Sequence, residues 1–264
     1  MKNQIISNLP ASYPWQGNLY YFNTIGSTNT YAKELAAKGA SHGTVIIADS
    51  QTGGRGRMGR NFHSPAGQGI YLSMILRPQC PAGQLMHLTC AVAVAAADGI
   101  QSATDLRPGI KWTNDLVIGK KKLGGILTEL SLNSEGNVDY AVVGIGINCA
   151  QAPEDFPEDI RQIATSLALC TGKAIDRAAV IAQILVALQK MSSNLQDTTA
   201  TLSRYRQDCI TIGQKISLVR GETVQHGVAL DVDESGALIV EFADGEIAPV
   251  TSGEVSIRGM YGYV

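Results

Sequence analysis

The sequence has no surplus of positive charge. Its 264 residues include 21 Lys and Arg against 23 Asp and Glu, which gives a formal net charge of -2 at pH 7. Non-specific binding to DNA or RNA depends on a basic excess, so the composition does not indicate a nucleic-acid-binding protein. Any positive charge that serves a ligand must therefore be concentrated locally.

Cysteine and histidine are scarce, and neither is spaced for a disulfide framework or a metal. The five cysteines are scattered without a CxxC pair, and the four histidines share no metal-ligand spacing. Scattered free cysteines are typical of a reducing compartment. We therefore expect a cytoplasmic protein with no metal site formed by the protein alone.

No stretch is apolar for long enough to cross a membrane. The most apolar run, LTCAVAVAAA at residues 88–97, is about half of the roughly 20 residues that a spanning helix needs. The first residues, MKNQIISNLPASYPW, lack the charged start and apolar stretch of a signal peptide. The apolar run therefore predicts a core helix, and we expect no membrane partner.

Short runs rich in Val, Ile and Tyr predict strands, and Pro-free runs with helical spacing predict helices. The expected strands are residues 18–25, 44–50, 70–78, 109–119, 121–132 and 138–149, and the expected helices are residues 27–39, 84–102, 176–193 and 198–208. Several strands follow one another directly, which favours an α+β fold: a mixed, mostly antiparallel sheet with helices packed on it. From residue 212 onward, short strands separated by polar turns predict a small β barrel or sheet.

The stretch SQTGGRGRMGRNFHSP, residues 50–65, is called the arginine-rich loop below. It places four glycines and three arginines within eight residues. Glycine lets the backbone pass close to a ligand, and arginine offers donors that suit carboxylates and phosphates, so we interpret the loop as a cradle for an anion. A GxGxxG match at residues 54–59 lacks the helix start of a dinucleotide site, and no P-loop ending is present. An RNA-binding Arg-Gly segment and a solvated, flexible turn are the alternatives.

Three strand ends contain glycine or finish in polar residues: KWTND at 111–115, KLGGIL at 122–127 and VGIGIN at 143–148. Strands usually avoid glycine unless another group must approach the backbone. Each stretch alone could be an ordinary turn or a solvated edge. Together with the arginine-rich loop, they could converge on one face of a single sheet and form a ligand site.

Taken together, these stretches resemble biotin protein ligases, also called biotin–[acetyl-CoA-carboxylase] ligases. The resemblance covers about residues 20–148 and is carried by STN at 27–29, Gln51, GRGRMGR at 54–60, KWTND, KLGGIL and GIN at 146–148, in this order. It implies the class II synthetase-like biotin/lipoate ligase fold over residues 1–210. The β-rich tail, residues 211–264, is similar to the family's SH3-like C-terminal domain.

The resemblance implies an enzyme that activates biotin with MgATP to biotinyl-5′-AMP and pyrophosphate. It then transfers the biotinyl group to one lysine of a biotin carboxyl carrier domain. ATP and Mg²⁺ would be the cofactors, with magnesium held mainly by the phosphates. The ligase-like region begins near Asn18, which leaves too few residues for the DNA-binding domain that some relatives carry, so we expect a ligase that does not bind DNA. It could be a monomer or a homodimer.

The same resemblance implies roles for individual residues. Arg57 and Lys122 are expected in catalysis as cations near the biotin carboxylate and the α-phosphate, and Asp115 is expected to orient or deprotonate the carrier lysine. The residues expected to bind biotin are Ser27, Thr28, Asn29, Gln51, Gly54, Arg55, Gly56, Arg57, Tyr71, Lys122, Gly125, Leu127 and Gly144. The residues expected to bind ATP are Arg57, Arg60, Phe62, Asn114, Lys122 and Asn148.

Two positions depart from the family pattern. Phe62 stands where the family often has tryptophan, which keeps an aromatic wall. Thr113 stands where the family often has proline, which removes a rigid residue beside Asn114. The alternative functions are a lipoate or octanoyl ligase of the same fold and a non-catalytic module that binds biotin or a nucleotide.

Overall fold

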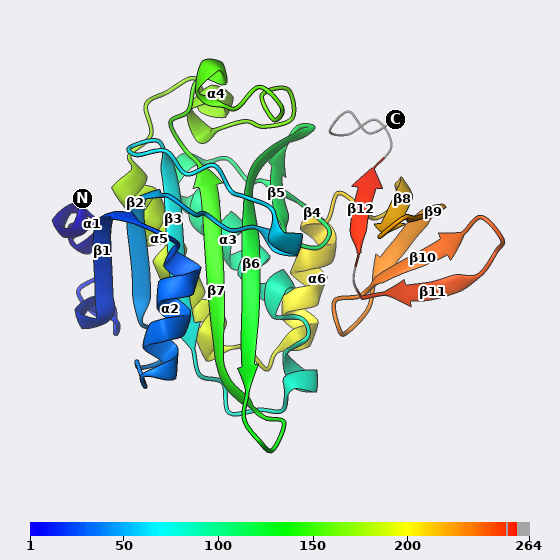
Figure 1. Ribbon diagram of the computed structural model, residues 1–264, viewed down its shortest axis with the longest axis horizontal. Coiled ribbons are helices and arrows are strands. Elements are labelled where there is room, and N and C mark those ends of the chain that lie inside the picture. Colours follow the sequence, from blue (N-terminus) through cyan, green and yellow to red (C-terminus); the bar gives the residue numbers. More distant parts are fainter. Residues whose placement is uncertain (252, 258–264) are drawn as a thin grey trace.

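A seven-stranded sheet forms the centre of the protein (Figure 1). The computed structural model describes residues 1–251 and 253–257. The strand order is β1-β2-β3-β7-β6-β5-β4, in which β1 and β2 are parallel and every other neighbouring pair is antiparallel. This confirms the predicted mixed, mostly antiparallel sheet. The strands are β1 (Leu19–Ile25), β2 (Val45–Gln51), β3 (Gly69–Leu76), β4 (Gly109–Lys111), β5 (Asp115–Ile118), β6 (Lys121–Leu132) and β7 (Val138–Asn148).

Helices cover both faces of this sheet (Figure 1). α2 packs on β2, β3 and β7 on one face, and α3 and α5 pack against each other and on the opposite face. The α-helices are α1 (Lys2–Asn8), α2 (Thr28–Ala37), α3 (Leu88–Thr104), α4 (Leu167–Thr171), α5 (Arg177–Ser193) and α6 (Thr198–Asp208). Short 3-10 helices are η1 (Gln16–Asn18), η2 (Arg57–Gly59), η3 (Ala82–Leu85) and η4 (Pro153–Asp155).

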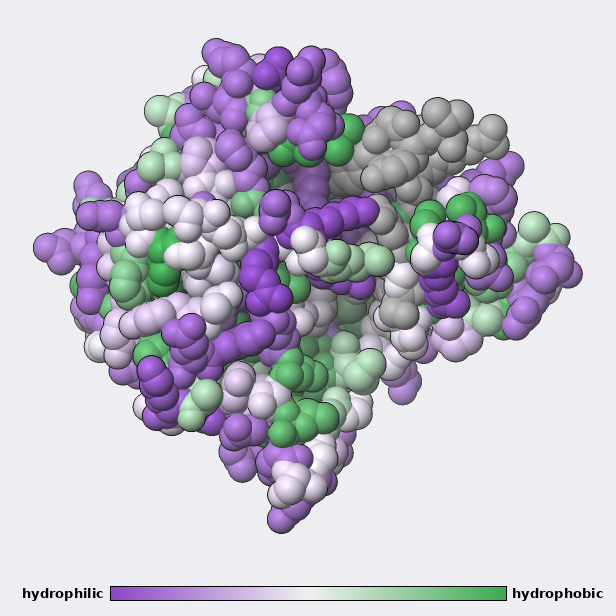
Figure 2. Space-filling view, viewed as in Figure 1, coloured by the Kyte–Doolittle hydropathy of each residue, from purple (hydrophilic) through white to green (hydrophobic). Residues whose placement is uncertain are grey.

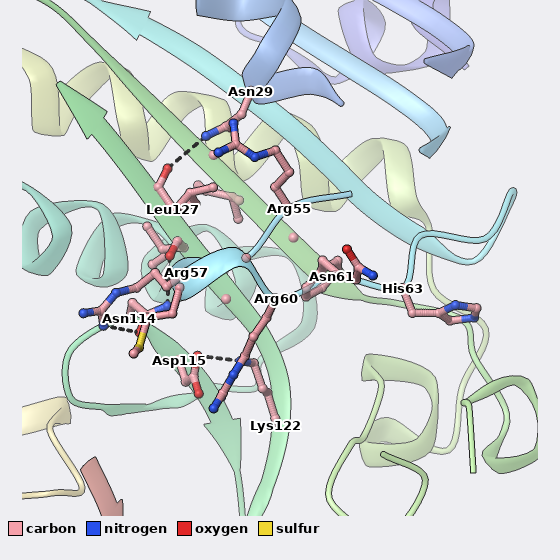
Figure 3. Close-up of a pocket in the computed structure, with 18 of the residues that line it drawn as sticks. Asn29, Arg55, Arg57, Arg60, Asn61, His63, Asn114, Asp115, Lys122 and Leu127 are labelled. Carbon is pink, nitrogen blue, oxygen red and sulfur yellow. Dashed lines mark hydrogen bonds and ion pairs between the residues drawn. The ribbon is translucent and has the colours of Figure 1, made fainter. Parts of the chain in front are cut away.

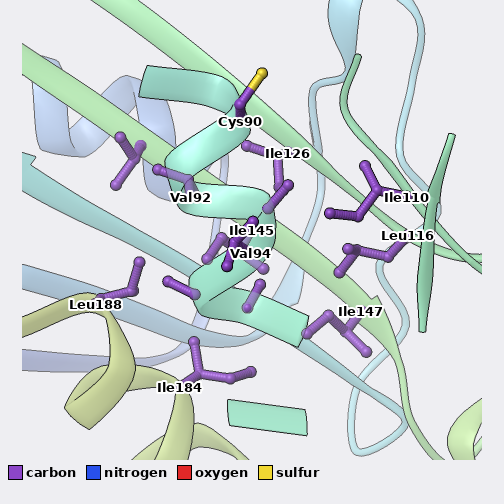
Figure 4. Packing of buried hydrophobic residues seen from close by; sticks show 14 of the residues in the cluster. Cys90, Val92, Val94, Ile110, Leu116, Ile126, Ile145, Ile147, Ile184 and Leu188 are labelled. Carbon is purple, nitrogen blue, oxygen red and sulfur yellow. The ribbon is translucent and has the colours of Figure 1, made fainter. Parts of the chain in front are cut away.

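α3 is the central helix of the hydrophobic core. Its apolar side chains pack against α5 and against the core-facing side chains of β6 and β7 (Figure 4). The segment Ala82–Thr104 has the length and composition of a membrane span, but 72% of its most apolar window is buried inside the protein. The expectation of a core helix is therefore confirmed, because sheet and helix side chains surround α3 where a spanning helix would meet lipid.

A five-stranded antiparallel sheet follows, in the order β11-β10-β9-β8-β12. Its strands are β8 (Lys215–Arg220), β9 (Thr223–Val232), β10 (Leu238–Phe242), β11 (Ile247–Val250) and β12 (Glu254–Ile257). The indole N–H of Trp112 donates to the carbonyl of Gly236, in the β9–β10 turn, at 2.9 Å. The turn before β5 is thus held directly by the C-terminal sheet.

Some elements differ from the prediction. The strand expected at residues 109–119 is divided into β4 and β5, because the chain turns at residues 112–114 and the Asn114 side chain donates to the carbonyl of Ile126 at 3.0 Å. α1, α4 and β12 were not predicted. They span only seven, five and four residues, which is too short for a periodic apolar pattern to be visible.

The contact between α3 and α5 requires glycine at position 99. A Cβ atom built on Gly99 would lie 2.5 Å from Ile184 Cα, which is backbone that cannot move aside. We expect Gly99→Ala to destabilise the protein by about 1–3 kcal/mol through overpacking, which exceeds the gain of about 1 kcal/mol in helix propensity. Urea unfolding measures this change. Gly83→Ala is the matched control because nothing lies within 4 Å of its Cβ position, and equal stability of both variants would contradict the packing argument.

Candidate functional site

A cavity of about 260 Å³ lies below the arginine-rich loop, on the sheet face that α2 also covers. Hydrophilic side chains gather around this hollow, between the α4 end of the molecule and the C-terminal sheet (Figure 2). The lining comes from the first turn of α2, the arginine-rich loop, the strands β3 to β7, residues 160–164, and Gly253 and Val255 beside and within β12. Segments distant in the sequence therefore meet at one site.

One end of the cavity is a neutral hydrogen-bond network. The side-chain oxygen of Gln51 accepts from the backbone N–H of Thr28 at 2.8 Å and from its hydroxyl at 3.1 Å. The Gln51 amide nitrogen donates to Ser64 Oγ at 3.0 Å. The Ser73 hydroxyl donates to Asn29 Oδ1 at 2.6 Å. This end suits an uncharged ligand group with its own donors and acceptors.

The other end carries cations (Figure 3). Arg57 donates to Asn114 Oδ1 at 2.9 Å, and among the residues described no carboxylate lies within ion-pair distance of Arg57. Lys122 Nζ lies 2.7 Å from Asp115 Oδ1. Because the partner of Arg57 is a neutral amide, its charge is available to an incoming anion.

The arginine-rich loop folds back on itself. The N–H of Gly56 donates to the carbonyl of Arg60 at 2.7 Å, and the N–H of Phe62 donates to the carbonyl of Gly54 at 3.0 Å. Only the single 3-10 turn η2 follows the glycines, so no helix N-terminus is presented as in a dinucleotide fingerprint. The loop is therefore a structured turn that lines the cavity, and its use as a cradle for an anion stays a prediction.

Glycines in β7 let two side chains lie directly on the sheet. A Cβ at Gly144 would be 2.0 Å from Asn29 Oδ1, and a Cβ at Gly146 would be 2.7 Å from the Phe62 ring. Gly125 is different, because a Cβ there would meet Asp115 and Lys122 only at ordinary contact distances of 3.6 Å. The protein itself does not require glycine at position 125, so a ligand that approaches the strand is the simplest reason for it.

A charged cluster on the same sheet face surrounds Glu129 of β6. Its carboxylate lies 2.9 Å from Lys33 Nζ and 3.5 Å from the guanidinium of Arg55, and it accepts from Asn29 Nδ2 at 3.0 Å. Burial raises the pKa of Glu129, but the hydrogen bonds from Lys33 and Asn29 and the charge of Arg55 outweigh it. The net pKa is lower than usual, so the carboxylate stays ionised at neutral pH.

The structure brings almost all of the expected site residues to this cavity. All of them line it except Gly54 and Tyr71. A Cβ at Gly54 would lie 2.4 Å from the carbonyl oxygen of Phe62, and the Tyr71 hydroxyl donates to the carbonyl of Pro65 at 3.0 Å. Both residues therefore contact other residues of the loop. Neither lines the cavity, so their roles as direct biotin contacts stay predictions.

Sequence reasoning missed the part of the lining that follows β7. Ile160, Ile163 and Ala164 line the cavity, because the segment pairs with the start of β6: the backbone N–H of Lys122 donates to the Ile163 carbonyl at 2.7 Å. Irregular chain of this kind has no periodic pattern, so no sequence signal marked it. The Trp112–Thr113 peptide bond is cis, and Asn114 reaches the cavity with threonine in the place of the family's proline.

Comparison with known proteins identifies relatives. The model of the biotin/lipoate A/B protein ligase family matches residues 21–148, and that of the biotin protein ligase C-terminal domain matches residues 211–258. The bifunctional ligase/repressor BirA of Bacillus subtilis is 38% identical over 243 residues, which are 91% of this chain and 74% of that protein. The biotin–[acetyl-CoA-carboxylase] ligase of Mycobacterium tuberculosis is 33% identical over 238 residues, which are 87% and 85% of the two chains. The structure of the Aquifex aeolicus biotin protein ligase in complex with biotin and ATP superposes with a TM-score of 0.76 at 30% identity, covering 91% of this chain and 98% of that chain.

The lowered pKa of Glu129 predicts a pH-dependent contribution to stability. A carboxylate whose pKa falls on folding adds stability above its ordinary pKa of about 4.3, and this stability is lost as pH falls through the folded-state value. We expect a higher urea midpoint for the wild type than for Glu129→Gln at about pH 7, with the difference closing between about pH 5 and pH 3. If the difference in urea midpoint stays constant over this pH range, the charge of Glu129 does not contribute to the difference in stability.

Proposed function

Because the chain belongs to the biotin/lipoate A/B protein ligase family, we propose that it is a biotin protein ligase. It joins biotin to ATP to form biotinyl-5′-AMP and pyrophosphate, then transfers the biotinyl group to a lysine of a biotin carboxyl carrier domain. The observation that carries this proposal is the cavity itself, with neutral hydrogen-bonding groups at one end and Arg57 and Lys122 at the other. Biotin has a neutral ureido ring at one end and a carboxylate at the other.

The neutral end fits the ureido ring. Asn29, Thr28 and Gln51 supply uncharged donors and acceptors there. The charge of Arg55, which also lines the cavity near Asn29, is offset by Glu129 at 3.5 Å. Gly125 leaves space beside the strand, and Leu127 adds an apolar wall between the two ends. The ring would therefore lie toward α2 and the carboxylate toward β5.

In the first step a biotin carboxylate oxygen attacks the α-phosphorus of ATP, and pyrophosphate leaves. The two reacting groups are both anions, so they approach only where positive charge offsets their repulsion. Arg57 offers a guanidinium that is bound to a neutral amide, and Lys122 adds an ammonium group at the same end. Arg60, Phe62 and Asn148 also line the cavity, and we propose that they contact the nucleotide.

In the second step the ε-amine of the carrier lysine attacks the carbonyl carbon of the mixed anhydride, and AMP leaves. The amine must lose a proton to become a nucleophile. Asp115, at 2.7 Å from Lys122, is the carboxylate at this end of the cavity and would orient or deprotonate the incoming lysine. The arginine-rich loop would cover the anhydride and exclude water that hydrolyses it.

Magnesium is expected to enter with ATP. Among the described residues no group of three His, Cys, Asp or Glu side chains is placed to hold a metal ion. Oxygen ligands from the nucleotide phosphates suit Mg²⁺, and when bound with them the ion would offset the charge of the leaving pyrophosphate. We further propose that the ligase domain ends at residue 210, between the end of α6 and the start of β8.

The adenylation step is tested by biotin-dependent exchange of labelled pyrophosphate into ATP. We expect exchange with biotin and not with lipoate or octanoate. Arg57→Ala should lower it about 100-fold or more, because the variant loses a preorganised cation at the reacting groups. Lys190→Ala, at an exposed position on α5, is the control and should match the wild type. Exchange with lipoate and not with biotin would show that the protein is a lipoate ligase of the same family.

The role of Asp115 is tested in the transfer step alone. Asp115→Asn keeps the size of the side chain and can still accept a hydrogen bond from Lys122, so pyrophosphate exchange should change little. Single-turnover transfer from preformed biotinyl-5′-AMP to a carrier domain should slow by at least about 10-fold, because the amide cannot take a proton from the lysine. An equal loss in both steps would show that Asp115 acts through Lys122 alone.

A further inference from the structure

The three arginines of the arginine-rich loop point to different places. Arg57 reaches Asn114, and Arg60 lines the cavity near Lys122, whereas Arg55 is directed toward Asn29 and Leu127, away from the Arg57 pair (Figure 3). The Arg55 guanidinium lies 3.5 Å from the carboxylate of Glu129. Arg55 is thus separated from the groups proposed to receive the reacting phosphate.

We propose that Glu129 is a positioning residue that holds the arginine-rich loop closed over the biotin end of the cavity through Arg55, and that orients the amide of Asn29. The inference rests on the proposed ligase function. It concerns a carboxylate that does not line the cavity and therefore acts on the ligand only through Arg55 and Asn29.

Glu129 contacts the arginine-rich loop at Arg55, where the two arms of the loop pair with each other. Arg55 forms a backbone bridge with Asn61, so the two residues close the base of the turn that carries Arg57. A side chain anchored at this base restrains both arms of the turn at once. The Arg55–Glu129 pair therefore links the position of the turn to β6, which is hydrogen-bonded to strands on both sides.

The connection to Asn29 fixes which way its amide faces. Nδ2 donates to the carbonyl of Leu127 at 3.3 Å and to Glu129 at 3.0 Å, while Oδ1 accepts from Ser73 at 2.6 Å. Two acceptors on one side and a donor on the other allow only one amide orientation. Since Asn29 lines the cavity above Gly144, this orientation determines what Asn29 offers to the ligand.

The contact with Arg55 is suited to a reversible closure. The Arg55 side chain is 47% exposed, and ion pairs with that much solvent contribute little to folding. Removal of the Glu129 charge should therefore alter how long the loop stays closed and leave the fold intact. Lys33 contacts the same carboxylate oxygen at 2.9 Å but belongs to α2, so it has no connection to the loop.

The test compares Glu129→Gln, Arg55→Gln and the double variant with the wild type. Pyrophosphate exchange gives KM for biotin and kcat, and release of biotinyl-5′-AMP without carrier domain gives the leakage rate. We expect both Glu129→Gln and Arg55→Gln to raise KM for biotin and the leakage rate by about three- to tenfold, with kcat nearly unchanged. The double variant should release biotinyl-5′-AMP no faster than the single variant with the higher KM for biotin. The reason is that both substitutions remove the same Arg55–Glu129 contact.

Lys33→Met is the matched control, because it removes an ion pair of the same carboxylate without touching the loop. The proposal is supported if Lys33→Met keeps the wild-type release rate of biotinyl-5′-AMP and the wild-type KM for biotin. It is overturned if Lys33→Met releases biotinyl-5′-AMP as fast as Glu129→Gln. Unchanged leakage in both Glu129→Gln and Arg55→Gln also overturns it. Wild-type protein that shows no exchange with biotin refutes the proposed function instead, so the two failures are distinguishable.

Discussion

The site depends on how closely other parts of the chain approach the β7 strand. β7 alternates glycine and isoleucine, so Gly144 and Gly146 face the cavity while Ile145 and Ile147 face α3 (Figure 4). This alternation follows from the two-residue period of a strand. Without side chains on the glycine face, Asn29 and Phe62 rest on the backbone itself. Asn29 and Phe62 are therefore placed directly against the backbone of the central strand of the sheet.

The cations that line the cavity differ in the kind of group that each one contacts. Lys122 and Arg55 are held by carboxylates, whereas Arg57 is held by the neutral amide of Asn114. The two kinds of contact have different consequences: a carboxylate partner offsets part of the charge of its cation, whereas a neutral amide leaves the charge of Arg57 fully available. One string of sequence thus supplies an arginine for the ligand and another for the position of the loop.

Much of the fold follows from local pattern. Ser27 caps α2 and Asp176 caps α5, in agreement with the helix starts expected at residues 27 and 176. The turn at Gly119 separates the strands expected at residues 109–119 and 121–132. The division of residues 109–119 into two strands was not predicted, because its cause is a hydrogen bond from Asn114 to Ile126 on another strand. The C-terminal sheet was expected as strands, but its contact with Trp112 was not.

The sequence by itself determined the family, the strand and helix types and nearly all of the residues at the cavity, because these reside in local patterns and in the order of short motifs. Only the tertiary structure decided what each residue does there. Gly54 and Tyr71 support the loop, Arg55 contacts Glu129, and residues 160–164 complete the wall. The reason is physical: each of these roles is set by a partner far along the chain, and strand pairing alone determines which distant partners meet.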